Sequence, residues 1–188
     1  INKSDIFSLR LSSFLDLFRN SCRAPGFEVR TFNAIPTAAG LASSASGYAA
    51  LVLALDDLTG WNLDRKKLSM LARLGSGSAS RSLYNGFVVW HTGISKSGMD
   101  SYAEPLDIIW PDFQLGLLEI DYKIKPISSR IAMQNTVATS PRYSKWHKRS
   151  TNDFNAIKKA IIDFDFDLVG QLSEENALEM HALMNEAT

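Results

Sequence analysis

A run of small residues at 36–47 (PTAAGLASSASG) leads directly into an apolar helical pattern at 48–55. A loop without bulky side chains lets the backbone approach a ligand closely, and Gly40 can adopt dihedral angles that other residues avoid. A helix that begins here directs its free N–H groups and the positive end of its dipole at the loop, which suits a phosphate group. Ordinary turn and capping chemistry uses the same residue types, so the residues alone leave both interpretations open.

The composition is that of a globular protein with no excess of positive or negative charge. Of the 188 residues 45% are hydrophobic, and 20 basic residues balance 20 acidic ones. A net charge of zero gives no reason to expect a nucleic acid or an anionic membrane as partner. The single cysteine, Cys22, excludes an internal disulfide framework. With no signal peptide and no apolar run of membrane-spanning length, we expect a cytoplasmic protein.

Hydrophobic spacing predicts helices and strands along the whole chain. Helical periodicity predicts helices at 5–21, from the small-residue loop to 59–60, and at 64–74, 128–139, 142–163 and 166–184. Apolar or alternating runs predict strands at 27–32, 87–90, 108–110 and 114–120. The change to an all-helical pattern predicts a domain boundary near 121–127, and hence domains at 1–124 and 125–188.

A second small-residue loop, Gly75 to Ser80 (GSGSAS), stands directly before Arg81. Its serines offer hydroxyl donors, its glycines can expose backbone N–H groups, and Arg81 presents a rigid fork that matches phosphate or carboxylate oxygens. The loop could instead be a flexible linker or a plain helix cap. The amphipathic helix before it and the apolar strand after it argue against a solvated linker, so an anion-binding loop is favoured.

These two loops resemble those of the GHMP small-molecule kinase superfamily. PTAAGLASSASG, with Ala42, is similar to the phosphate loop of its mevalonate diphosphate decarboxylase branch, and GSGSASRSLYNGFVVW (75–90) to that family's substrate loop. Weaker similarities occur in the family's order at 98–106, 128–141 and 175–184. The resemblance implies an α+β, GHMP-kinase-like two-domain fold: an N-terminal domain of sheet and helices, then the helical start of a ferredoxin-like C-terminal domain.

The resemblance also implies a reaction. Members of the family use ATP and Mg²⁺ to phosphorylate the tertiary hydroxyl of mevalonate 5-diphosphate, which then loses phosphate and carbon dioxide to give isopentenyl diphosphate. By motif, the ATP phosphates would be held by Gly40, Leu41, Ala42, Ser43 and Ser44, with Ser44 also near the metal. The substrate would be held by Ser76, Gly77, Ser78, Ala79, Ser80, Arg81, Ser129 and Arg130. Met133 aligns with a family methionine, but a core position is the simpler expectation for it.

Two family segments are missing from these 188 residues, one bearing a lysine (KYWGK type) and one bearing the proposed catalytic aspartate (DAGPN type). We therefore assign no catalytic residue, and we expect a piece of a longer protein that is inactive alone. A kinase of the same superfamily that stops at phosphate transfer, and a non-catalytic binding protein on the same fold, remain alternatives. Relatives are commonly homodimers. His91, His147 and His181 are widely spaced and are not expected to bind a metal.

Overall fold

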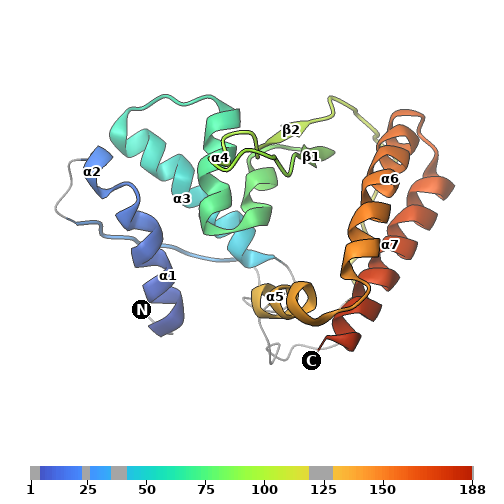
Figure 1. The fold of residues 1–188 in the computed structure, drawn as a ribbon. Helices are drawn as coiled ribbons and strands as arrows, with labels where there is room; N and C mark the ends of the chain where they lie inside the picture. The colour runs from blue at the N-terminus through green and yellow to red at the C-terminus, as the bar shows by residue number, and fades with distance from the viewer. Residues whose placement is uncertain (1–4, 23–25, 35–41, 119–128, 188) are drawn as a thin grey trace. The chain divides into compact units, whose positions relative to one another are not determined.

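The computed structural model describes residues 5–22, 26–34, 42–118 and 129–187 (Figure 1). The chain divides into two compact units, Ile1–Asp107 and Ile108–Thr188. The domain boundary predicted at 124/125 lies in a segment outside the described residues and stays a prediction. Within the described residues, no helix combines the length and the apolar character needed to cross a bilayer.

The first unit is built from helices around one apolar core. They are α1 (Asp5–Asp16), α2 (Arg19–Cys22), α3 (Ser43–Thr59), α4 (Arg65–Gly75) and the 3₁₀-helix η1 (Gly77–Leu83). The single helix predicted at 5–21 is therefore interrupted by a turn between α1 and α2. Phe14 of α1 packs its ring edge-on against Tyr48 of α3, with 5.0 Å between ring centroids. Val52 and Leu68 complete the contact between α3 and α4 in the same core.

The ends of these helices follow from local residue chemistry. α3 ends at Gly60, whose left-handed conformation (φ 64°) lets its N–H reach the last carbonyls of the helix. α4 begins after Asp64, whose carboxylate accepts a hydrogen bond of 2.8 Å from the backbone N–H of Lys67. These two caps fix the short connection between α3 and α4, which brings the helices side by side.

Two short strands complete the first unit. β1 (Val88–Trp90) and β2 (Ala103–Pro105) pair antiparallel, with Val89 opposite Glu104. β1 confirms the strand predicted at 87–90. The strand predicted at 27–32 is wrong: Phe27 and Val29 do turn toward the core, but this segment pairs with no strand among the described residues. Alternating apolar residues make a strand only where a partner strand supplies hydrogen bonds.

The second unit is helical. It contains α5 (Ser129–Thr139), α6 (Tyr143–Ile162) and α7 (Phe166–Glu186), which confirms the three helices predicted there. α6 and α7 form an antiparallel hairpin (Figure 1) with Ala160, Val169 and Leu183 buried. The strands predicted at 108–110 and 114–120 are not formed in the described part, 108–118. Leu115 there is 83% exposed, so no apolar surface holds the segment in a sheet.

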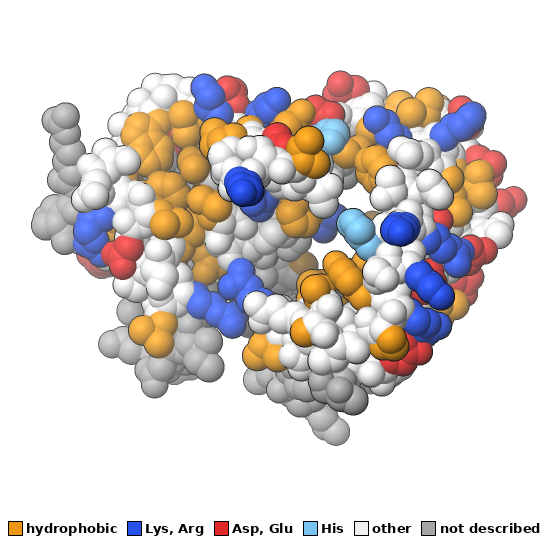
Figure 2. Space-filling view, in the orientation of Figure 1, with side chains coloured by type: hydrophobic (Ala, Val, Ile, Leu, Met, Phe, Trp, Pro, Cys, Tyr) orange, Lys and Arg blue, Asp and Glu red, His pale blue; other side chains and the backbone are white. Residues whose placement is uncertain are grey.

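Charges over this hairpin are mixed. Figure 2 shows basic and acidic side chains interspersed over α6 and α7. Arg149 of α6 forms ion pairs with Asp153 on its own helix and with Glu175 and Glu179 on α7. Three carboxylates therefore surround the guanidinium of Arg149.

Candidate functional site

The first loop enters α3 through an unusual backbone conformation. Ala42 is left-handed (φ 52°, ψ 34°) and cannot cap the helix with its side chain, and the first turn contains no acidic residue. Ser43 is half-buried and Ser44 is exposed. Gly40 and Leu41 lie outside the described residues. A long helix whose start has neither a side-chain cap nor a carboxylate can take an anion at its first N–H groups.

The second loop lies directly against the first turn of α3. Ser76 stands in an extended conformation between α4 and η1, and its hydroxyl oxygen is 3.4 Å from that of Ser44. The hydroxyl oxygen of Ser78 lies 3.4 Å from that of Ser76 on the other side. Ser44, Ser76 and Ser78, the serine row, thus join the two loops that the sequence singled out separately. A ligand at either loop would adjoin a ligand at the other.

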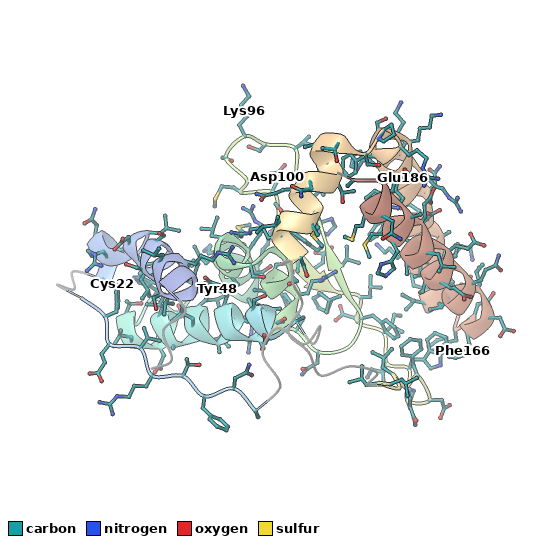
Figure 3. The ribbon with its side chains drawn as sticks, turned by 90° about the horizontal axis from the view of Figure 1, so that it is seen from below. Cys22, Tyr48, Lys96, Asp100, Phe166 and Glu186 are labelled. Carbon is teal, nitrogen blue, oxygen red and sulfur yellow. The ribbon has the colours of Figure 1, made fainter. Side chains whose placement is uncertain are left out.

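Aromatic packing explains why the second loop contains glycines. A Cβ atom on Gly75 would lie 2.1 Å from the ring of Tyr48, and one on Gly77 would lie 2.7 Å from the ring of Trp90. Tyr48, seen on α3 in Figure 3, follows Ser44 by one helical turn. Its ring against Gly75 therefore brings the end of α4 to the start of α3 and places Ser76 beside Ser44. The sequence suggests only exposed backbone N–H groups for these glycines.

The rest of the second loop divides into buried and exposed residues. Ala79 and Ser80 are fully buried, and the hydroxyl of Ser80 donates a 2.8 Å hydrogen bond to the carbonyl oxygen of Gly77. These two buried residues stabilise the conformation of η1. Arg81 is exposed, with its guanidinium carbon 5.8 Å from the centre of the Trp90 ring. Among the described residues no carboxylate forms an ion pair with Arg81, so its charge is available to an anionic ligand.

The remaining predicted site residues belong to the second unit. Ser129 and Arg130 are the first two residues of α5, and both are exposed. Their role beside a bound substrate therefore stays a prediction. Met133, expected in the core, is 51% exposed, so that expectation is wrong within this unit.

The described residues offer few side chains that could bind a metal ion. The described residues contain no cluster of three or more His, Cys, Asp or Glu side chains. His91 is 2.8 Å from the carboxylate of Glu104 on the neighbouring strand, near the surface. The hydroxyl oxygen of Ser44 is one oxygen at the start of α3 that could contact a metal ion.

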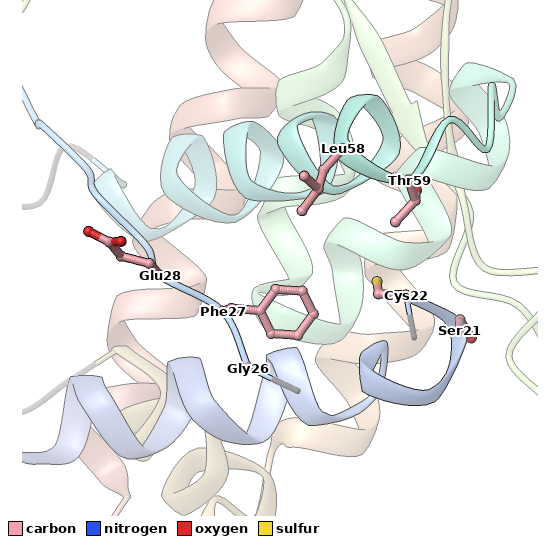
Figure 4. Close-up of a pocket in the computed structure, with 7 residues that line it drawn as sticks. All are labelled: Ser21, Cys22, Gly26, Phe27, Glu28, Leu58 and Thr59. Atoms are coloured by element: carbon pink, nitrogen blue, oxygen red, sulfur yellow. The ribbon is translucent and has the colours of Figure 1, made fainter. Parts of the chain in front are cut away.

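A pocket lies at the other end of α3 (Figure 4). It is lined by Ser21, Cys22, Gly26, Phe27, Glu28, Leu58 and Thr59. With a helical rise of about 1.5 Å per residue, Thr59 is roughly 22 Å along α3 from Ser44. The lining has no basic side chain and includes the carboxylate of Glu28, so it is a poor match for a phosphate. It is separate from the serine row.

Sequence reasoning missed Tyr48 and Trp90. Their positions in the chain indicate ordinary apolar residues of a helix and a strand, whereas the structure places their rings against the glycines of the second loop. The glycines themselves are the available signal, because a glycine often marks a position where another group approaches the backbone closely.

Comparison with known proteins shows the family of this chain. The profile of the diphosphomevalonate decarboxylase-like N-terminal domain matches residues 2–103, more than half of the chain. The chain belongs to the diphosphomevalonate decarboxylase family. The matched segment contains both loops and the whole serine row.

Individual members of the diphosphomevalonate decarboxylase family show the same relationship. The diphosphomevalonate decarboxylase of Candida albicans is 43% identical over 157 residues, which are 80% of this chain and 42% of that protein. The crystal structure of the Staphylococcus aureus mevalonate diphosphate decarboxylase superposes with a TM-score of 0.84 at 37% identity, over 100% of this chain and 56% of that one. A structure of MDDEF in complex with MVAPP, AMPPCP and magnesium gives 0.81 at 37% identity, over 95% and 55%.

These matches confirm the predicted α+β, GHMP-kinase-like fold. The chain spans about two fifths of the length of the curated relative from Candida albicans. Residues 2–103 match the family's N-terminal domain.

Proposed function

We propose that the protein containing this chain decarboxylates mevalonate 5-diphosphate with ATP and Mg²⁺, giving isopentenyl diphosphate. The serine row is the observation that supports this most strongly, because the hydroxyl oxygen of Ser44, proposed to bind the nucleotide, lies 3.4 Å from that of Ser76, proposed to bind the substrate. Phosphoryl transfer requires the donor phosphate and the acceptor hydroxyl to be held in line at short distance. Family membership supplies the identity of the two molecules.

In this proposal the chain's residues bind and orient rather than react covalently. Ser44 and the first amides of α3 hold the nucleotide phosphates, and Ser76, Ser78 and Arg81 hold the diphosphate substrate. The phosphoryl group passes from ATP to the tertiary hydroxyl. The C–O bond to that phosphate then breaks, and its electron pair leaves with the phosphate. The C–C bond to the carboxylate breaks at the same time, and its electron pair forms the double bond. Phosphate and carbon dioxide leave.

The described residues fit a nucleotide and its metal. The start of α3 carries no side-chain cap and no acidic residue in its first turn, so its N–H groups and dipole are open to phosphate oxygens. Mg²⁺ is usually held by substrate phosphates and a few protein oxygens, and Ser44 offers such an oxygen. When bound, the metal would neutralise charge that develops on the transferred phosphoryl group. A solved relative is in complex with AMPPCP and magnesium.

The experiment is an activity assay on the full-length protein with mevalonate 5-diphosphate, ATP and Mg²⁺. We expect ADP, phosphate and carbon dioxide in equal amounts. Release of ADP without carbon dioxide would instead identify the kinase alternative, in which the reaction stops at phosphate transfer. Absence of ATP binding to the full-length protein would favour a non-catalytic binding protein.

Arg81→Ala tests the substrate loop. Losing a charged bidentate contact should cost about 2–4 kcal/mol of substrate binding, so KM for mevalonate 5-diphosphate should rise by roughly 30-fold or more. KM for ATP should change far less. Arg30→Ala is the matched control, because Arg30 is 88% exposed and its ion pair among the described residues is with nearby Glu28. An unchanged substrate KM and turnover in Arg81→Ala would contradict the assignment.

Ser129 and Arg130 are proposed as further diphosphate contacts from the second unit, by motif alone.

Two further parts of the proposal, the cell compartment and the assembly, also depend on the family rather than on a contact. We infer a cytoplasmic enzyme, and a homodimer as is common among relatives. Light scattering on the full-length protein measures the mass of the assembly, and a monomer at micromolar concentration would contradict the dimer.

A further inference from the structure

Trp90 contacts the substrate loop at two separate points. Its ring lies so close to Gly77 that a Cβ added there would be 2.7 Å from Cη2 of the ring. The guanidinium carbon of Arg81 lies over the face of the same ring, 5.8 Å from its centre. A strand residue thus supports both the turn that carries the serine row and the cation that follows it. Trp90 belongs to β1, which pairs with β2, so the support is rigid.

The indole ring is itself fixed. Its Nε1–H donates a 3.2 Å hydrogen bond to the hydroxyl oxygen of Ser101. Ser101 is only 4% exposed, and its hydroxyl donates in turn to the carbonyl oxygen of His91 at 3.0 Å. Because the hydrogen of Ser101 is committed to His91, its lone pair faces Trp90. The hydrogen bonds therefore hold one orientation of the ring.

We propose that Trp90 is a positioning residue for substrate binding, which holds Arg81 over its face so that the guanidinium meets the diphosphate; this inference rests on the proposed function. An exposed arginine samples many rotamers, and ordering it on binding costs entropy. No described carboxylate forms an ion pair with Arg81, so within the described residues the indole face is the restraint on its guanidinium. Tryptophan is the best aromatic platform for a cation.

The test measures the binding of mevalonate 5-diphosphate to the full-length protein by calorimetry. Trp90→Leu removes the ring face, and we expect the dissociation constant to rise by about three- to tenfold. Trp90→Phe keeps a face but loses the N–H, and should recover most of the affinity. Trp61→Leu is the matched control: Trp61 packs near Phe18 in the same unit, so it can lower the melting temperature but should leave the dissociation constant unchanged.

A double-mutant cycle distinguishes positioning from a general structural role. If Trp90 acts through Arg81, Trp90→Leu should weaken binding much less in an Arg81→Ala background than in the wild type. Equal losses in both backgrounds would overturn the inference. Ser101→Ala offers a milder change if Trp90→Leu does not fold: it should raise the dissociation constant about two- to threefold in the wild type and far less beside Arg81→Ala.

The two proposals fail differently. A wild-type protein that does not bind mevalonate 5-diphosphate overturns the proposed function and the role of Trp90 with it. A wild-type protein that binds this substrate but shows no coupling between Trp90 and Arg81 overturns the role of Trp90 alone.

Discussion

At the scale of single residues, the site depends on the absence of side chains at two glycines. Gly75 admits the ring of Tyr48 and Gly77 admits the ring of Trp90. Each contact draws one end of the second loop against a neighbouring element. The serine row follows from this packing, because Ser76 lies between the two glycines. In this loop, glycine is needed for close approach more than for an unusual dihedral angle.

Alanine substitutions at two glycines should therefore have opposite effects. In Gly75→Ala the new Cβ meets the Tyr48 ring, and the resulting overpacking should cost about 1–3 kcal/mol of stability. Gly47 lies in the exposed part of α3, where an added Cβ would have nothing within 4 Å, so Gly47→Ala should stabilise by about 0.5–1 kcal/mol through helix propensity. Chemical denaturation measures both. Equal effects of the two variants would refute the packing argument.

Some of the site residues could be predicted from the sequence and others could not. Ser44, Ser76, Ser78 and Arg81 stand in recognisable motifs, so their neighbourhood could be predicted, although their contacts with ligands stay predictions. Trp90 could not be found this way, because its role arises from a strand packing against a loop that precedes it by several residues. Hydrophobic pattern marks such a side chain as buried without saying what it touches.

At the scale of elements, α4 begins with a titratable cap. The hydrogen bond from the backbone N–H of Lys67 lowers the pKa of Asp64 below its usual 3.8. Hydrogen bonds from the N–H groups of Ile94 and Ser95 likewise lower the pKa of Asp100. A carboxyl group with a depressed folded-state pKa stabilises the protein above its unfolded pKa, and that contribution is lost as pH falls through the folded value.

Asp64→Asn isolates the pH-dependent part of this cap. Asparagine can also accept the capping hydrogen bond but does not titrate. The wild-type protein should lose melting temperature below pH 3.8, and Asp64→Asn should lose less over the same interval. Thermal unfolding at a series of pH values measures the difference. Parallel curves for the two proteins would show that Asp64 contributes nothing to the acid transition.

The α6–α7 hairpin depends on a few buried side chains. Leu183 is 1% exposed, whereas Leu178 on the same helix is 64% exposed. Leu183→Ala should cost about 2–5 kcal/mol through lost burial and a cavity, and Leu178→Ala less than about 0.5 kcal/mol. Hydrogen exchange in α7 of the full-length protein measures the change locally. Similar exchange in the two variants would contradict the packing described for this hairpin.

Strands are harder to predict from this sequence than helices. Segments 27–32 and 108–118 carry apolar residues that suit a sheet, but neither pairs with a strand among the described residues. Helices satisfy their backbone groups internally, so periodicity alone locates most of them. A strand needs a second segment, and which segment pairs with it cannot be inferred from its own residues.

At the scale of the whole molecule, the two units differ in the features that their sequences produce. The first contains two small-residue loops brought together by tertiary contacts, while the second is a helical array with balanced surface charge. The fold class was predicted through motif resemblance, and the family match confirms it. The balanced composition gives no reason to expect a nucleic acid as partner, and it could not identify a substrate.

The serine row has a consequence for how the two loops communicate. Each hydroxyl has one hydrogen to give, and the contacts Ser44–Ser76 and Ser76–Ser78 can be oriented in either sense. An incoming anion that takes the hydrogen of Ser44 would leave that oxygen to receive from Ser76, which would then receive from Ser78. In that orientation the row has no hydrogen left for a second anion, so holding both ligands at once would require Ser76 and Ser78 to turn their hydrogens to the diphosphate and give up the contacts within the row.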